Sequence, residues 1–331
     1  MKKLLRAATI LLLAAGLLLI GAFGVSHMVY GRSLKASAYE LVLRYRNRNH
    51  PTPEAETARL EAKRAAGEKP YQLPSYMEFA VPVAESKARD MQVFTLNPGG
   101  GDVTVAYIHG GAHVNSFNAY QWRFMDRLAR ETGCEVVAPA YHLAPFGDSA
   151  RGCADVAALL TDRMETSPSR RLILMGDSAG GGLALAAAEA LAAEGERLPE
   201  RLILFSPWVD VSMDNPEVKA LVSVEPMLSL ELTALHGRYW AGEGDPHDWT
   251  ASPLYGSMEG LPPVTMYCGT RELLYPDILL AQEKLADAGV DAALHVGRGL
   301  NHDYPLMPIP EAEDAMREVE ALVLGDDHHT P

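Results

Sequence analysis

The sequence has 331 residues, of which 48% are hydrophobic and 22% are charged, a composition typical of a globular protein that forms one large domain or two small ones. Its formal charge of −14 argues against nucleic acid as a partner, because phosphate binding needs a basic surface. The three cysteines are odd in number and far apart, so they show neither a disulfide framework nor a zinc-ligand spacing.

The N-terminal segment differs in charge from the rest of the chain. Residues 1–66 contain 11 Lys and Arg against 4 Asp and Glu, whereas the remainder is acidic. Basic residues precede a charge-free apolar run at residues 7–25, which is just long enough to cross a bilayer as a helix and longer than the apolar part of a typical signal peptide. We therefore expect residues 1–33 to form a signal anchor ahead of a soluble body.

Two features bear on the orientation and processing of this anchor. The basic residues before the run favour a single-pass protein of the cell membrane with an extracytoplasmic body, although Arg32 and Lys35 on the other side weaken that orientation. Residues 36–38, Ala-Ser-Ala, have the form of a cleavage site, so a secreted protein freed from its signal peptide is the main alternative. A buried helix of a soluble fold is the third interpretation.

Residues 34–75 predict two helices and a linker. Pro51 and Pro53 interrupt the first helical pattern, and an acidic-to-basic helix follows them, an order that suits the helix dipole. The arginines at 44–48 form either a solvated face or a contact with anionic headgroups. Residues 67–75 are the expected linker into the catalytic domain.

From residue 76 the pattern alternates between strands and helices. This alternation predicts an α/β fold with a mostly parallel, eight-stranded sheet and helices on both faces. We expect the domain to span 76–325 and to leave 326–331 as a flexible polar tail. The strands are expected at 77–83, 91–95, 103–108, 135–138, 171–175, 202–205, 264–268 and 292–296, and helices after Ser116 and at 154–164, 183–194, 229–240, 276–288 and 311–324.

The interval between Pro207 and Pro262 is too long for a single crossover between strands. We interpret residues from about 211 to 250 as an insertion that helps to form a helical cap over the active site. The alternative is a peripheral excursion without a role in binding.

Residues 171–182 carry the strongest catalytic signal. A buried strand runs into Gly-Asp-Ser-Ala-Gly and then into a helix of small residues, which places Ser178 at the apex of a sharp turn. Gly176 and Gly180 flank the turn because side chains there would clash where the backbone reverses. A Gly-x-Ser-x-Gly turn of this kind is the nucleophile elbow of α/β-hydrolases.

A nucleophilic serine needs a base to take its proton and an acid to orient that base. His302 follows the last strand, at the carboxyl edge of the sheet where active sites form, whereas His295 lies inside that strand. Glu272 follows the preceding strand and is the expected acid, in the order that α/β-hydrolases use. Asp277, at the start of the next helix, is the alternative acid.

Acyl transfer also needs N–H donors for the developing oxyanion. The amide of Ala179, directly after the nucleophile, is one expected donor. An upstream loop, His109-Gly110-Gly111-Ala112, follows another buried strand, and its glycines allow the backbone to approach a substrate closely. Gly110 and Gly111 are therefore the other expected donors of the oxyanion hole.

Together these motifs resemble the hormone-sensitive-lipase-like family of α/β-hydrolases, also called the alpha/beta hydrolase fold-3 group. The resemblance implies hydrolysis of carboxylic esters, usually with short acyl chains, without a metal or organic cofactor. It also implies a cap made from N-terminal helices and from an insertion after the sixth strand. The matching residues are His109-Gly110-Gly111, Tyr141-His142-Leu143-Ala144-Pro145, Gly176-Asp177-Ser178-Ala179-Gly180-Gly181, Ser206-Pro207-Trp208-Val209-Asp210, Gly269-Thr270-Arg271-Glu272 and the loop around His302.

The chain departs from the family pattern at several positions. Ala112 replaces the third glycine of a His-Gly-Gly-Gly motif, but the resemblance assigns the oxyanion contacts mainly to the first two amides, so the oxyanion hole is expected to survive. His113 stands where an aromatic residue is common, and together with Trp208 it is expected to shape the substrate pocket. Glu272 is longer than the usual Asp, and the apolar run at 7–25 lies outside the family core.

The sequence therefore predicts a serine carboxylic-ester hydrolase that acts on a small-molecule ester and contacts a membrane through residues 7–25. The same groups cleave activated amides or remove acetyl groups when the cap admits such substrates, so a deacetylase or amidase is the alternative. A ligand-binding protein on a hydrolase scaffold is a third possibility, which the presence of Ser178, Glu272 and His302 disfavours.

Overall fold

The computed structural model of this protein describes residues 21 and 23–326. Its eight-stranded sheet has the strand order β1-β2-β4-β3-β5-β6-β7-β8. The pairs β1–β2 and β2–β4 are antiparallel and all the others are parallel, which confirms the expected mostly parallel sheet. The strands are β1 (Val83–Ala88), β2 (Met91–Leu96), β3 (Val103–Ile108), β4 (Glu135–Ala140), β5 (Arg171–Asp177), β6 (Arg201–Phe205), β7 (Val264–Gly269) and β8 (Ala292–Gly297).

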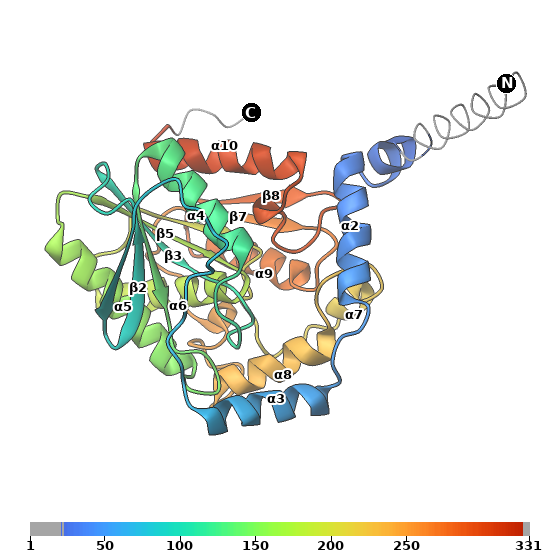
Figure 1. Cartoon of the computed structure of the whole chain (residues 1–331), viewed down its shortest axis with the longest axis horizontal. Helices are drawn as coiled ribbons and strands as arrows, with labels where there is room; N and C mark the ends of the chain where they lie inside the picture. The colour runs from blue at the N-terminus through green and yellow to red at the C-terminus, as the bar shows by residue number, and fades with distance from the viewer. Residues whose placement is uncertain (1–20, 22, 327–331) are drawn as a thin grey trace, which may run out of the picture.

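Helices cover both faces of this sheet (Figure 1). α4 and α10 pack together over one face with α2 beside them, whereas α5, α6 and α9 cover the other, and buried apolar side chains fill both interfaces. The helices are α2 (Leu34–Asn47), α3 (Pro53–Ala66), α4 (Ala119–Thr132), α5 (Ser149–Thr166), α6 (Ser178–Glu194), α7 (Val218–Leu221), α8 (Leu230–Ala241), α9 (Tyr275–Asp287) and α10 (Pro310–Leu324), with short helical segments η1 (Val25–Val29), η2 (Pro253–Tyr255) and η3 (Tyr304–Leu306).

The structure corrects the start of one expected helix and the position of one expected strand. The helix placed after Ser116 begins at Ala119, because the side chain of Asn118 caps it and Gln121 returns a hydrogen bond to the Asn118 backbone. The strand placed at 77–83 is absent: its amides at Ala80 and Val81 donate instead to the carboxylate of Asp126 on α4.

The first strand of the sheet is instead β1, an edge strand that pairs only with β2. Its residues are mostly exposed, so it has no buried face and no apolar alternation. An edge strand of this kind lacks the apolar alternation that identifies a strand in a sequence. The sequence therefore predicts a strand in the more apolar segment before it, at residues 77–83.

The N-terminal helices and the insertion after β6 contact one another. α3 and α8 lie side by side (Figure 1), where Glu56 Oε1 is 2.7 Å from His236 Nε2 and the Tyr239 hydroxyl donates to Glu61 at 3.0 Å. Leu60 of α3 is fully buried in a cluster with Val114, in the loop that follows β3. α3 is therefore packed onto the carboxyl edge of the sheet, where the expected active site lies.

The structure describes little of the expected membrane segment. Residues 7–20 and 22 of the apolar run lie outside the described residues, as do residues 327–331 of the expected tail. Among the described helices, none has the length and apolar character needed to cross a bilayer. The described residues at the end of the run and just after it expose apolar side chains, namely Phe23, Val25, Met28 and Val29.

Candidate active site

β5 leads into α6 through the strained turn that carries Ser178. Ser178 has a φ of 51°, a left-handed conformation that costs a non-glycine residue about 1–2 kcal/mol. A Cβ atom on Gly180 would lie 2.1 Å from the Ile108 carbonyl oxygen, and one on Gly176 would lie 2.5 Å from the Gly180 carbonyl oxygen, so both positions require glycine. The turn leaves Ser178 only 8% exposed, at the carboxyl edge of the sheet.

The structure brings together the three residues of the expected triad. His302 Nε2 lies 2.9 Å from Ser178 Oγ, and His302 Nδ1 lies 2.6 Å from Glu272 Oε2. Since a carboxylate only accepts, Nδ1 is the nitrogen that carries the proton towards Glu272 and Nε2 faces the serine. The three side chains come from the loops after β5, β7 and β8, and all three are buried.

Glu272 is completely buried, and its remaining hydrogen bonds explain how it is held. Oε1 accepts from the Ser206 hydroxyl at 2.9 Å and from the Gly269 amide at 2.6 Å. Ser206, the residue after β6, also accepts from the Asp303 amide at 2.9 Å. We did not predict a role for Ser206, although it lies in the Ser-Pro-Trp motif that signalled the family.

Asp277, the alternative acid, has a different partner. It is also buried, but its Oδ1 accepts from Asn215 Nδ2 at 2.7 Å. Burial raises the pKa of Asp277 to about 6. The structure therefore places Glu272, and not Asp277, against the imidazole of His302.

Several carboxylates surround His302. Burial alone would lower the pKa of His302, but the neighbouring carboxylates of Asp303, Glu272 and Glu225 outweigh burial and raise it above the ordinary histidine value. Of these, only Glu272 was expected. Glu225 belongs to the insertion after β6, and the Leu273 amide donates to its Oε2 at 3.0 Å, so the insertion contacts the loop that carries Glu272.

The expected oxyanion loop differs in one amide from the prediction. The Gly110 amide donates to Asp177 Oδ1 at 2.9 Å, so it is occupied and does not face an oxyanion. Asp177 also accepts from the Tyr107 hydroxyl at 2.7 Å and from Gln121 Nε2 at 2.8 Å, which fixes this buried carboxylate behind the loop. The sequence motif shows that a glycine is needed at 110 but not where its N–H points.

The next two amides of the loop, those of Gly111 and Ala112, donate to no protein acceptor in the part of the chain that the structure describes. Both residues have positive φ, 126° at Gly111 and 54° at Ala112, and so does His113 at 59°. This conformation explains why glycine suits position 112 and why Ala112 is strained there.

His113 and Trp208, the two expected pocket residues, are both buried. The His113 ring stacks on Trp240 of α8 with a centroid distance of 3.8 Å, and it lies 5.8 Å from the Trp208 ring. Burial lowers the pKa of His113, so its ring is neutral. The Trp208 amide donates to the Ser178 carbonyl at 2.9 Å. His113 thus fills the position where an aromatic residue is common in the family, and its ring stack joins the loop after β3 to α8.

α2 braces the loops that carry the acid and the base. Glu40 is buried and accepts from Arg32, from Arg44 at 2.8 Å and from Arg271 at 3.0 Å. Arg271 precedes Glu272, and Arg32 donates to the Gly299 carbonyl at 2.6 Å, three residues before His302. The arginine cluster at 44–48 is therefore only partly a solvated face, because Arg44 is held by Glu40 and by the Val224 carbonyl.

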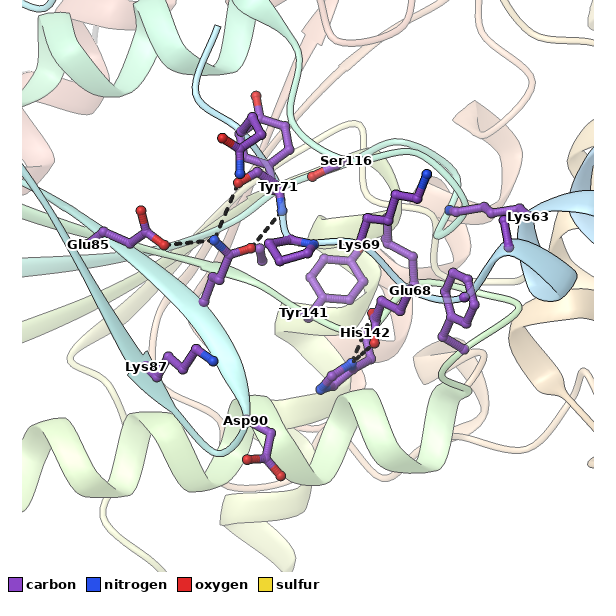
Figure 2. A pocket seen from close by; sticks show the side chains of 18 residues that line it. Lys63, Glu68, Lys69, Tyr71, Glu85, Lys87, Asp90, Ser116, Tyr141 and His142 are labelled. Carbon is purple, nitrogen blue, oxygen red and sulfur yellow. Dashed lines mark hydrogen bonds and ion pairs between the residues drawn. The ribbon is translucent and has the colours of Figure 1, made fainter.

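A cavity of about 670 Å³ lies outside this site (Figure 2). Figure 2 shows Glu68 paired with His142. Gln92 is hydrogen-bonded to the Tyr71 backbone and to Glu85. Neither Ser178, Glu272 nor His302 lines it. Its lining residues are Lys63, 66–72, Glu85, Lys87, Asp90, Gln92, Ser116, 140–143 and Phe146.

Comparison with known proteins identifies the family to which this chain belongs. The sequence profile described as alpha/beta hydrolase fold matches residues 105–306. The chain is 30% identical to an esterase of Acinetobacter venetianus over 65% of its own length and 72% of the relative, and 31% identical to ethyl acetate hydrolase of Pseudomonas putida over 65% and 71%. A solved esterase structure from the bacterial hormone-sensitive lipase family superposes with a TM-score of 0.75 at 25% identity, covering 89% of this chain and 99% of the other.

The brace formed by α2 gives a testable prediction. Glu40→Gln removes the charge that three arginines share, and breaking a buried ion pair costs about 3 kcal/mol of unfolding free energy. We expect that loss in chemical denaturation, together with faster amide hydrogen exchange in residues 270–274 and 299–302. Glu131→Gln is the control, because Glu131 pairs with Arg130 on the surface and its loss costs less than about 1 kcal/mol. Wild-type stability and exchange in Glu40→Gln would contradict the brace.

Proposed function

The chain belongs to the alpha/beta hydrolase fold family and is hormone-sensitive-lipase-like, and from that premise we propose that it is a serine carboxylesterase that hydrolyses short acyl esters. One observation carries the proposal: the continuous chain of contacts from Ser178 Oγ through His302 to Glu272, with distances of 2.9 and 2.6 Å. These are the groups and the geometry that nucleophilic acyl transfer requires.

The proposed reaction has two halves. In the first, Ser178 Oγ attacks the ester carbonyl while its proton passes to His302 Nε2, and His302 then delivers that proton to the departing alcohol. In the second, His302 takes a proton from water, whose oxygen attacks the acyl-enzyme and releases the acid and free Ser178. Glu272 holds the imidazole through Nδ1 and stabilises its charged form in both halves.

We propose a revised set of donors for the oxyanion. Gly111 and Ala179 keep the role that the sequence indicates. The Gly110 amide is bonded to Asp177, so Ala112 takes its place as the third donor. The proposal is supported by the amides of Gly111 and Ala112, which lack a protein acceptor among the described residues and lie on a loop of positive φ.

Short acyl groups are the proposed substrates. Two relatives at 31% identity are named acetyl-hydrolase and ethyl acetate hydrolase, and both names denote removal of a two-carbon acyl group. The stack of His113, Trp208 and Trp240 supports the same choice, because its three buried rings fill space between the loop after β3 and α8, and the Trp208 amide is bonded to the Ser178 carbonyl.

We further propose that residues 7–25 attach the enzyme to the cell membrane, with the body outside the cytoplasm. The support comes from the uninterrupted apolar run and from the basic residues on its N-terminal side. The exposed apolar side chains of Phe23, Met28 and Val29 continue this apolar character into the described residues.

The nucleophile is tested by Ser178→Ala. This change removes the attacking oxygen, so turnover of p-nitrophenyl acetate is expected to fall by roughly 10⁴–10⁶-fold. A fluorophosphonate probe, which reacts with activated serines, should label the wild type and not the variant. Turnover that survives the substitution would overturn the assignment.

The acid is tested by a matched pair of isosteric changes. Glu272→Gln leaves the shape of the site but removes the charge that stabilises the imidazolium, so we expect kcat to fall by about 10³-fold or more. Asp277→Asn removes an equally buried carboxylate that does not contact His302, and kcat should stay within about tenfold of the wild type. The opposite ranking of the two variants in steady-state kinetics would assign the acid to Asp277.

Membrane attachment is tested on the full chain in its natural host. We expect the enzyme to stay with the membrane fraction after alkaline carbonate washing, because an apolar helix across the bilayer is not displaced by removing charge contacts. Protease added outside the cytoplasmic membrane should digest the body. Recovery of the full-length chain in the soluble fraction contradicts the anchor, and a shortened soluble chain indicates cleavage near residues 36–38.

A further inference from the structure

The residue after His302 brings a second carboxylate to the catalytic histidine. Asp303 Oδ2 lies 3.3 Å from His302 Nε2, the nitrogen that also lies 2.9 Å from Ser178 Oγ. Glu272 occupies the other ring nitrogen, Nδ1. Nε2 therefore has two competing neighbours, a hydroxyl that gives it a proton in the reaction and a carboxylate that attracts any proton already bound there.

The backbone holds Asp303 in this position. Its φ is 55°, a left-handed conformation that Asp, Asn and Gly adopt more readily than other residues. The Asp303 amide donates to Ser206 Oγ at 2.9 Å, and that hydroxyl donates to Glu272. The same serine thus fixes the backbone of Asp303 and the carboxylate of the proposed acid.

Of the two carboxylate oxygens of Asp303, Oδ2 contacts His302 Nε2 and Oδ1 has no such neighbour. Oδ1 is buried without a hydrogen-bond partner in the described part of the chain, and the whole side chain is only 17% exposed. An unsatisfied buried carboxylate oxygen is unfavourable, so nothing but the imidazole offsets the burial of this charge. A protonated His302 therefore stabilises the ionised form of Asp303.

The other carboxylates around Asp303 and His302 favour the protonated form of both residues. The carboxylates of Asp177, Glu272 and Glu225 face it, and the Tyr107 hydroxyl lies beside Asp177. Burial and these like charges raise the pKa of Asp303, while His302 lowers it.

We propose that Asp303 is a further residue of the catalytic centre, whose carboxylate, 3.3 Å from Nε2, stabilises protonated His302 through its charge and thereby sets the lower pH limit of the reaction. The inference rests on the proposed function. Below that limit, Nε2 carries a solvent proton that the charge of Asp303 stabilises, which leaves Ser178 without a base. Above it the proton is lost, and the proton that Nε2 then takes from Ser178 during attack is stabilised by Asp303 until the departing alcohol receives it.

The test is the pH dependence of kcat/KM in Asp303→Asn, with p-nitrophenyl acetate followed at the isosbestic wavelength of the product. Asparagine keeps the shape and tolerates the left-handed backbone, so only the charge is removed. Since the charge favours protonated His302, its loss lowers the pKa of the histidine and moves the acidic limb down by about 1–3 pH units. Just below the wild-type limb, the variant is expected to be about tenfold faster or more.

Two variants complete the design. Asp303→Gly also suits a positive φ, removes the carboxylate altogether and should move the limb in the same direction. Asp90→Asn is the matched control, because Asp90 is an exposed aspartate with a φ of 65° in the turn between β1 and β2, and its limb should coincide with that of the wild type. A limb that stays in place or moves up in both Asp303 variants would overturn the proposal.

A second readout separates this inference from the proposed function. Nitrogen-15 NMR of labelled histidine reports the titration of His302 directly and needs no substrate. If the wild type hydrolyses no ester, the proposed function fails, while a lower pKa of His302 in Asp303→Asn still supports stabilisation of protonated His302 by Asp303. If the wild type is an active esterase and the His302 titration is the same in both proteins, the inference fails alone.

Discussion

The carboxylate of Glu272 is completely buried, and the loops that form the catalytic edge converge on it. Its oxygens accept hydrogen bonds from Ser206 after β6, from Gly269 at the end of β7 and from His302 after β8. A buried carboxylate is costly unless it is fully paired, and these donors satisfy its oxygens and hold it in place. In return the carboxylate fixes the imidazole with Nε2 towards Ser178. The positions of the base and, through Ser206, of Asp303 both depend on this one group.

A second buried carboxylate, that of Asp177, holds the loop on the other side of the proposed nucleophile. Asp177 accepts from Tyr107, Gly110 and Gln121, so it joins β3, the oxyanion loop and α4 behind Ser178. By taking the Gly110 amide, it leaves the following amides of the loop to face the site. The strain at Ser178 and Ala112 is tolerated because the two carboxylates and the close-fitting glycines hold the backbone from both sides.

Elements outside the sheet reach the same loops. Glu225 of the insertion bonds to the Leu273 amide, and Glu40 of α2 bonds to Arg271, so the neighbours of Glu272 on both sides are held from outside the sheet. α2 also reaches the loop of His302 through Arg32 and Gly299. Any displacement of α2 or of the insertion must therefore break one of these contacts or move the loop that carries the acid. The N-terminal helices and the insertion are therefore connected by direct contacts to the loops that carry the proposed catalytic groups.

The order of strands and helices, the elbow at Ser178 and the loops that carry Glu272 and His302 could all be derived from the sequence, because they depend on local rules: apolar periodicity, glycine at crowded turns, and the placement of active sites at the carboxyl ends of strands. The edge strand β1 could not be predicted from the sequence, because it has no buried face and therefore no apolar alternation. The occupied amide of Gly110, the bridging hydroxyl of Ser206, the approach of Asp303 to Nε2 and the contact of Arg44 with the Val224 carbonyl were decided only by the tertiary structure. Each of these contacts depends on the direction in which one N–H, hydroxyl or carboxylate points. That direction is set by a partner distant in sequence or by a single backbone angle, and no residue pattern along the chain encodes it.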